Sequence, residues 1–264
     1  MLKRDRACVS VNQKSYSKSV IHSYENSTKR AITIVLLIVF FVGFFVNTRL
    51  VVSTPVGPVI TMLSNETRNI TASNMINTSG GSITTMVINA TSQNTRWKAF
   101  VGNVVGTLTL DDSEGMTIFD WNITTLVGEV YATRASGNIN WSNINCSNST
   151  HISNEEIALD HTGNPADNIS ATFNQKLHDE FYVGTIRIQA NSCYSVHTYV
   201  NDSSQNTYFE EVLLYDGSNS TNGNMIYATI LEDNRYGFDN GTYDFQMIVP
   251  ERASTGWSSS TAYY

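Results

Sequence analysis

Ala31–Val46, AITIVLLIVFFVGFFV, is a run of sixteen residues without a charge. Lys29 and Arg30 stand directly before it, and Arg49 follows shortly after it. A helix of this length covers about 24 Å, somewhat less than the roughly 30 Å hydrocarbon core of a bilayer. The run is apolar all round, whereas the core helix of a soluble domain keeps a polar stripe. We therefore expect residues 31–52 to form a transmembrane helix or a signal segment.

Two fates of this run follow from its residues alone. In the first, the run stays in the membrane as an uncleaved signal anchor made by Ile32–Val46. In the second, it is a secretory signal peptide, with Val51 and Ser53 as the small residues before a cut at Thr54. The leader would then be unusually long, and no Ala-x-Ala is present. The anchor is the favoured interpretation.

A third fate rests on resemblance. Lys29–Thr33, KRAIT, followed by the apolar run, resembles the processing site of archaeal class III signal peptides, which occur on type IV pilin-like and archaellin-like proteins. The resemblance implies a cut between Ala31 and Ile32, and an apolar segment that packs in the core of a filament. Pilin helices usually continue as a long stalk, whereas Pro55 and Pro58 stop a helix here soon after the run.

Charge divides the chain at the same place. Residues 1–30 carry seven Lys or Arg and two acidic residues, a net charge of +5, and the remaining chain carries nine basic and twenty-one acidic residues, a net charge of −12. Basic residues beside a membrane segment stay in the cytoplasm. We therefore expect a basic cytoplasmic leader, a single membrane pass in contact with lipid, and an extracytoplasmic C-terminal part. The acidic balance argues against nucleic acid as a partner, because no basic patch displaces counterions from phosphates.

Short apolar segments recur beyond the run. Residues 53–95 are rich in Ser, Thr and Asn and are expected to form a stalk, in which Val59–Leu63 and Ser82–Asn89 are candidate strands. Within residues 96–253, strand-like segments follow one another about every ten residues, with no long amphipathic helix between them. The chain is therefore expected to be mainly β, with an antiparallel β-sandwich or barrel-like domain after the membrane segment. Residues 254–264 are expected to be a loose polar tail.

Two β-hairpins are the clearest local predictions. The first joins Phe100–Leu110 to Met116–Trp121 through the acidic turn Asp111–Gly115, and the second joins Tyr208–Tyr215 to Met225–Leu231 through the polar loop Asp216–Asn224. Further strands are expected at Leu126–Thr133, Ile139–Ile144, Phe181–Ala190, Tyr194–Val200 and Tyr243–Val249, and one short helical turn at Glu155–Asp160.

Cys146 and Cys193 are the only cysteines beyond the run. An even pair in an oxidising compartment favours a disulfide. The bridge would close a loop of about forty-seven residues and contribute roughly 3–4 kcal/mol by the chain-entropy estimate. A two-cysteine metal site is the alternative, but no Cys-x-x-Cys or His-x₃-His spacing accompanies the pair. Cys8 stands in the leader and is interpreted as a spare thiol.

Asn-x-Ser/Thr sequons are the strongest chemical signal beyond the run. Random order of the same residues would give roughly six, whereas twelve are present. The excess predicts an N-glycosylated, exported surface. Asn26-Ser27-Thr28 is also a sequon, on the side expected to be cytoplasmic, and shows that the motif arises without meaning. The twelve candidate sites are Asn65, Asn69, Asn77, Asn89, Asn122, Asn140, Asn145, Asn148, Asn168, Asn201, Asn219 and Asn240.

Catalytic motifs are missing from the sequence. No histidine sits in His-Glu-x-x-His, no serine in Gly-x-Ser-x-Gly, and no Gly-rich loop is suited to cradle phosphate. Glu210 and Glu211 are a possible carboxylate pair, but a solvated strand face explains them more simply. We therefore expect no enzyme activity, no catalytic residue and no cofactor. The histidines in question are His151, His161, His178 and His197.

Two features admit a binding role. Asp111, Asp112 and Glu114 supply hard oxygen atoms that suit Ca²⁺, although an EF-hand spacing is lacking and an ordinary hairpin turn is the simpler interpretation. No metal site is therefore predicted. Exposed aromatic rings can stack on sugars, but aromatic rings also fill the cores of sandwiches. The tryptophans in question are Trp97, Trp121, Trp141 and Trp257.

Three segments, Trp97–Thr133, Gly237–Gly241 and Phe245–Glu251, resemble archaeal surface proteins of uncharacterised activity. The resemblance implies an envelope location and supplies no catalytic residue. We predict a membrane-anchored, N-glycosylated cell-surface protein with a structural or adhesive role, which contacts other envelope proteins or assembles with itself. The alternatives are a pilin-like filament subunit and a carbohydrate- or Ca-dependent binding module.

Overall fold

The computed structural model describes residues 55, 57–69, 75–89, 91–122, 125–137, 139–163, 165–217, 223–252 and 260–264. Within those ranges, no helix is both long enough and apolar enough to cross a bilayer. The leader 1–30, the segment 31–52 and the processing site at Arg30, Ala31 and Ile32 lie outside the described residues. What was expected of them therefore stays a prediction.

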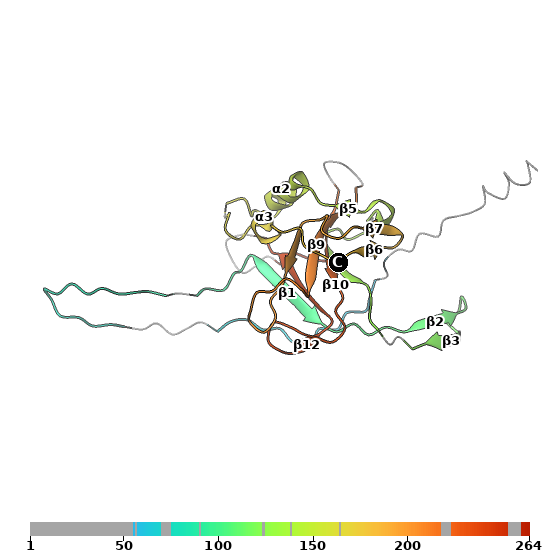
Figure 1. Ribbon diagram of the computed structural model, residues 1–264, viewed down its shortest axis with the longest axis horizontal. Coiled ribbons are helices and arrows are strands. Elements are labelled where there is room, and N and C mark those ends of the chain that lie inside the picture. Colours follow the sequence, from blue (N-terminus) through green and yellow to red (C-terminus); the bar gives the residue numbers. More distant parts are fainter. Residues whose placement is uncertain are drawn as a thin grey trace, which may run out of the picture. The chain divides into compact units, whose positions relative to one another are not determined.

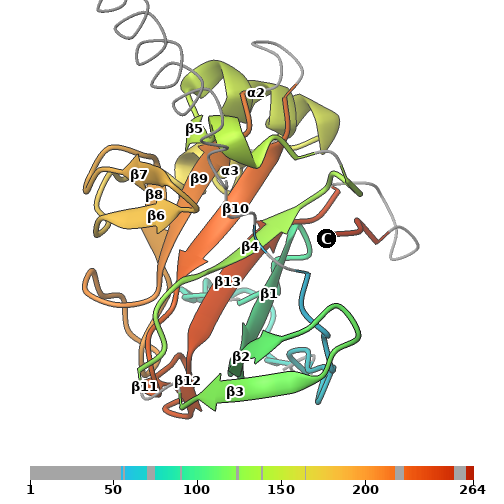
Figure 2. The ribbon, with the colours of Figure 1, turned by 90° about the vertical axis from the view of Figure 1, so that its right-hand side faces the viewer.

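A five-stranded antiparallel sheet carries most of the core (Figures 1 and 2). Its strands lie in the order β4 (Glu129–Thr133), β10 (Met225–Ile230), β9 (Glu210–Tyr215) and β5 (Asn145–Cys146), and β8 (Ser195–His197) also pairs with β9. The predicted hairpin around residues 216–224 is confirmed as the β9–β10 pair. The expectation of a mainly β chain with antiparallel sheets is confirmed as well.

Both faces of β9 and β10 are covered. On one face, Leu213 and Tyr227 lie opposite each other and pack against helices α2 (Ser149–Ala158) and α3 (Ile169–Thr172). Figure 2 shows these helices at the end of the sheet where β10 begins. The other face packs against the small hairpin described below. Two-sided cover agrees with the nearly continuous apolar composition of these strands, since a strand with one wet face alternates apolar and polar residues.

A two-stranded ribbon completes the first face. β1 (Trp97–Gly102) pairs antiparallel along its whole length with β13 (Phe245–Pro250). Phe100–Leu110 was predicted to be one arm of the first hairpin. Only its end belongs there, because the part up to Gly102 pairs with β13 instead. That partner lies more than a hundred residues further along the chain, so no local turn signal announces it.

Several element boundaries differ from the predictions. The single strand expected at Phe181–Ala190 is a tight hairpin of β6 (Phe181–Val183) and β7 (Ile186–Ile188), because Gly184 adopts a positive φ of 61° and turns the chain. The helix expected at Glu155–Asp160 is α2, which begins at Ser149 because Asn148 caps it. Residues 139–144 contain a 3₁₀ turn, η1 (Trp141–Asn143), in place of a regular strand.

The ends of the described chain also differ from expectation. Val59–Leu63 and Ser82–Asn89 are not strands, since they are extended and exposed but pair with nothing among the described residues. β-prone composition alone does not make a strand without a partner. Residues 260–264 of the expected loose tail are instead docked. Tyr264 exchanges two backbone hydrogen bonds with Thr133, and the Tyr263 hydroxyl donates to the Pro250 carbonyl.

Two further small sheets are each formed by one pair of strands. β2 (Leu108–Asp111) and β3 (Thr117–Trp121) confirm the predicted hairpin around the acidic turn. β11 (Arg235–Tyr236) pairs with β12 (Thr242–Tyr243), and this hairpin takes Tyr243 from the strand that was expected to run over Tyr243–Val249.

Candidate functional site

The β2–β3 hairpin is exposed at every residue. Its register places Leu108 opposite Trp121 and Leu110 opposite Phe119, so these four apolar side chains share one face. Each of them is 47–58% exposed, and the Phe119 and Trp121 rings meet edge to face at 4.9 Å. We call Leu108, Leu110, Phe119 and Trp121 the hairpin face. An isolated two-stranded hairpin is only marginally stable in water, so an uncovered apolar face of this kind is suited to contact something else.

The acidic turn of this hairpin is held by hydrogen bonds from its own backbone amides to the Asp112 side chain. Asp112 Oδ1 accepts the amides of Glu114 and Met116, each at 2.9 Å. These amides, Met116 first, hold the pKa of the Asp112 carboxyl below its usual value. Within the described residues, no group of three or more His, Cys, Asp or Glu side chains is placed to hold a metal ion. Asp111, Asp112 and Glu114 therefore form a hairpin turn, with no gathered cation ligands.

The predicted disulfide joins Cys146 at the end of β5 to Cys193 just before β8, with 4.9 Å between the Cα atoms. His178 holds the Cys193 side of this bridge in place. Its Nε2 accepts the amides of Ser192 and Cys193 at 3.1 and 3.0 Å, and its Nδ1 lies 2.7 Å from the Asp179 carbonyl. Nε2 must therefore be the unprotonated nitrogen, and Nδ1 carries the proton. His178 is thus a neutral, fully paired structural histidine.

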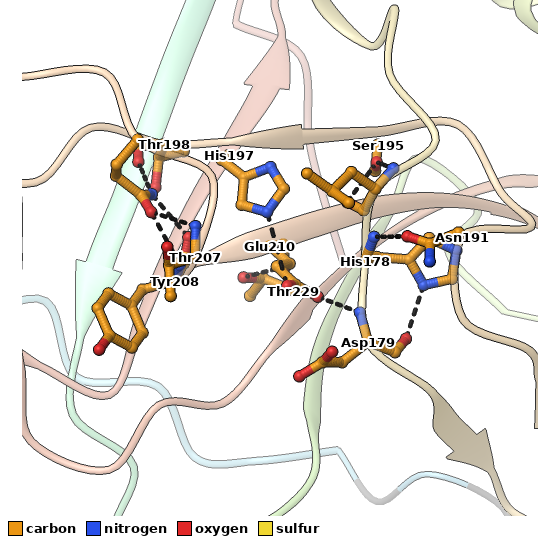
Figure 3. A network of polar contacts seen from close by, with 12 residues as sticks. His178, Asp179, Asn191, Ser195, His197, Thr198, Thr207, Tyr208, Glu210 and Thr229 are labelled. Carbon is orange, nitrogen blue, oxygen red and sulfur yellow. Dashed lines mark hydrogen bonds and ion pairs between the residues drawn. The ribbon is translucent and has the colours of Figure 1, made fainter.

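A second buried histidine lies beside it (Figure 3). His197 on β8 lies opposite Glu210 on β9, with 3.5 Å between Nε2 and a carboxylate oxygen, and both side chains are buried. Neither ring nitrogen of His197 makes a hydrogen bond. The other Glu210 oxygen accepts the Asp179 amide at 2.5 Å, which ties the segment after His178 to the sheet. Glu210 was expected on a solvated strand face, and this expectation is wrong, because Asp179 and the β6–β7 hairpin that follows it cover that face.

Burial also affects the pKa of two other carboxyl groups, Glu232 after β10 and Glu129 on β4. Burial raises the pKa of Glu232 above its usual value, against the opposing effect of Arg235, whose Nε lies 3.5 Å from its carboxylate. Burial also raises the pKa of Glu129 on β4, although the Tyr131 hydroxyl donates to it at 3.1 Å. The dominance of burial favours the neutral form of both carboxyl groups.

A shallow pocket of about 180 Å³ lies between α2 and the start of β10. Arg134 forms a bidentate ion pair with Glu155 at 2.7 and 2.6 Å on its wall, and the rings of His151 and Tyr215 stack 3.5 Å apart. The pocket has few apolar lining groups, and its one cation is already neutralised by Glu155. A small-molecule site of ordinary kind is larger and mostly apolar, so this pocket is a weak candidate.

The sequons lie on accessible surface. Of the twelve candidate asparagines, nine are exposed and two, Asn140 and Asn168, are partly buried, whereas Asn219 lies outside the described residues. Asn148 and Asn168 cap α2 and α3 through Oδ1, which leaves Nδ2, the atom that carries a glycan, outside the cap. Accessibility permits modification but does not single these sites out, because no asparagine in the described ranges is buried.

The tryptophans divide between core and surface. Trp97 packs edge to face against the buried His161 at 5.9 Å, and Trp141 packs in the same way against Tyr131 at 5.2 Å. Trp121 alone of the described tryptophans is exposed, and Trp257 lies outside the described ranges. Sugar stacking is therefore an available role for Trp121, whereas Trp97 and Trp141 serve packing.

Comparison of the chain with protein families, with curated proteins and with solved structures finds no match.

Proposed function

We propose that the chain is a membrane-anchored, N-glycosylated cell-surface protein with a structural or adhesive role in an archaeal-type envelope. The observation that carries this proposal is the disulfide between Cys146 and Cys193. Such bridges persist in oxidising compartments and are rare in the cytosol. The bridge lies on the acidic side of the apolar run, the side that the charge asymmetry assigns to the exterior.

The sequon excess and its accessibility support the same side. A glycan adds a bulky, soluble group, and such a group is tolerated only where the asparagine reaches solvent. Eleven of the twelve candidate asparagines are described, and none of them is buried. Three parts of the proposal rest on the sequence: the single membrane pass, the contact with lipid, and the stalk of residues 53–95.

Glycopeptide mapping by mass spectrometry tests the proposal on protein isolated from its native membrane. We expect glycans at several sequons beyond the run, most readily at Asn65, Asn69, Asn77, Asn148 and Asn240. Asn26 is the internal control and should be unmodified. A chain with every mapped sequon bare, or with Asn26 modified, would contradict the proposal.

The hairpin face favours a second candidate, a carbohydrate-binding module. Phe119 and Trp121 form an exposed aromatic pair, and aromatic rings of this kind stack on sugar faces. Asp120 and Asp111 lie on the other side of the same strands and would remain in water.

A glycan array separates this candidate from a purely structural role. We expect a signal that is lost in Trp121→Ala and in Phe119→Ala but kept in Ile118→Ala, which removes a more exposed apolar side chain that is not part of the hairpin face. A flat array for the wild-type chain would remove the candidate.

The filament subunit remains a proposal of the sequence alone, because its processing site lies outside the described residues. N-terminal sequencing of protein from the envelope discriminates the three fates of the apolar run. A start at Ile32 supports a filament subunit, a start at Thr54 supports secretion, and an intact Met1 supports the anchor.

A further inference from the structure

Glu211 is a carboxyl group buried in the centre of the fold. It lies on β9, is 0% exposed, and points to the same face of the sheet as Leu213 and Thr229. One carboxyl oxygen, Oε2, accepts the backbone amide of Ile248 at 2.8 Å. The other oxygen, Oε1, is buried without a hydrogen-bond partner. The sequence suggested a solvated strand face here, which is wrong because the β1–β13 ribbon covers this face.

The bond from Ile248 is one of two that join the backbone of β13 to side chains of β9 and β10. β13 uses one edge to pair with β1, and its other edge faces β9 and β10. There Glu211 accepts the Ile248 amide, and the Thr229 hydroxyl donates to the Gln246 carbonyl at 2.9 Å. Glu211 and Thr229 lie directly opposite each other on β9 and β10. Two side chains therefore replace the backbone ladder that would otherwise join the ribbon to the sheet.

Among the described residues, no cation forms an ion pair with Glu211. β8 places Val196 opposite it, with Tyr194 next on the same face. β10 contributes Tyr227, and the C-terminal segment contributes Tyr263, whose rings meet edge to face at 5.9 Å.

Three cations of the described residues lie near this side of the sheet. Lys176 is exposed, with its Nζ 4.8 Å from the centroid of the Tyr194 ring, and the other two are engaged with carboxylates. Arg134, after β4, pairs with Glu155 of α2, and Lys98 of β1 pairs with Glu251 at 2.9 Å. A charged Glu211 would therefore be a buried carboxylate with one amide bond and no counterion, which is strongly unfavourable.

Burial raises the pKa of Glu211 well above its usual value, and the single bond from Ile248 only partly opposes this. The group therefore binds a proton more tightly in the folded chain than in the unfolded chain. Its contribution to stability is fully present below the unfolded pKa and is lost as pH rises through the folded pKa.

We propose that Glu211 is a proton-dependent latch: with its proton it fastens the β1–β13 ribbon to the central sheet, and loss of that proton loosens the ribbon. The ribbon includes β1, which directly follows residues 53–95. The latch therefore acts where the chain enters the domain. This inference rests on the fold alone and stands whether or not the chain is anchored or glycosylated.

Unfolding measured against pH tests the latch on the full chain. Between the unfolded pKa of about 4.3 and the folded pKa, one linked proton changes the unfolding equilibrium constant tenfold per pH unit. We expect the ratio of this constant in wild type to that in Glu211→Gln to rise tenfold per pH unit from pH 5 upward. The glutamine leaves a neutral group of the same shape, so it shifts stability by an amount independent of pH. A constant ratio from pH 4 to pH 8 would overturn the proposal.

Glu114→Gln, on the exposed hairpin turn, is the matched control and should run parallel to wild type. Native-state hydrogen exchange of the Ile248 amide, corrected for the intrinsic rate, locates the effect in the ribbon. We expect its protection to fall with pH in wild type but to stay level in Glu211→Gln. Equal protection in both chains at every pH would contradict the latch.

A carbon-13 titration of the wild-type Glu211 carboxyl needs no variant that must fold. Its midpoint should lie above those of the exposed glutamates, and a midpoint among them would overturn the proposal.

Discussion

The β2–β3 hairpin and the β9–β10 hairpin begin from the same local pattern and reach opposite environments. Both join two short strands through a polar turn that contains Asp and Gly, and both were predicted from that pattern. Every residue of β9 is buried, whereas every residue of β2 and β3 is exposed. Turn chemistry therefore decides that a hairpin forms, and distant segments decide whether it is covered.

The composition of the strands carries part of this difference. β2 alternates Leu with Thr and Asp, as a strand with one dry face does, whereas β9 continues from Val212 through Tyr215 without a polar residue. The contrast predicts different energetic roles for the two hairpins. The β9–β10 pair should stabilise the domain, and the hairpin face of β2–β3 should matter for contacts with other molecules.

The largest expected effect on stability comes from the disulfide that ties β5 to the segment before β8. Replacing Cys146 or Cys193 with Ser should lower the free energy of unfolding by roughly 3–4 kcal/mol, because a loop of about forty-seven residues is no longer closed in the unfolded chain. Urea unfolding measures the loss. Cys8→Ser is the control and should unfold like wild type, and an equal loss in that variant would show that the bridge is not responsible.

One leucine from each hairpin tests the difference in burial between β9–β10 and β2–β3. Leu213→Ala on β9 should cost about 3 kcal/mol, because a fully buried side chain leaves a cavity. Leu110→Ala on β2 should cost less than about 0.5 kcal/mol, because that side chain is already in contact with water. Similar losses in the two variants, measured by the same urea series, would mean that the hairpin face is covered in the folded protein.

His178 is the next test, on the β8 side of the central sheet. His178→Ala should cost about 2 kcal/mol, because the amides of Ser192 and Cys193 lose their shared acceptor. Thermal unfolding in the oxidised state isolates this effect from loss of the disulfide. A change of less than about 0.5 kcal/mol would show that water replaces the imidazole at no cost.

The smallest effect concerns pH at the edge of the buried sheet. Burial raises the pKa of Glu129, so its contribution to stability is present below pH 4 and is lost as pH rises through its folded pKa. Glu129→Gln should therefore raise the melting temperature relative to wild type at pH 7 and leave it nearly unchanged at pH 3.5. The same shift at both pH values would show that the proton on Glu129 is not involved.

The predictions that succeeded depend on local chemistry. The two hairpins follow from Asp111–Gly115 and Asp216–Asn224, and the disulfide follows from an even count of cysteines beyond the run. β1 was partly misassigned because its partner, β13, lies far along the chain and no turn residue marks the pairing. The predicted start of helix α2, Glu155, is six residues too late in the sequence. Asn148, the residue that caps the helix, was interpreted only as a sequon.

The buried polar residues were the hardest to foresee. Glu210 and Glu211 stand side by side in sequence, and alternation alone would place one of them in water. Both are buried because Asp179 and the β6–β7 hairpin that follows it cover one face of β9, and the β1–β13 ribbon covers the other. His178 and His197 carry no motif in sequence, since their roles depend on amides and carboxylates that only the fold brings near. The one sequence signal for this burial was the presence of two adjacent glutamates, Glu210 and Glu211, in an otherwise apolar strand.

The side of the membrane on which the domain lies is the central claim, and labelling of intact cells tests it most directly. A membrane-impermeant, amine-reactive reagent should modify Lys176, which is exposed on the domain, and should spare Lys14 and Lys18 of the leader until the cells are opened. Mass spectrometry of the labelled peptides reads both outcomes from one sample. Label on Lys14 and Lys18 in intact cells, with Lys176 spared, would contradict the account.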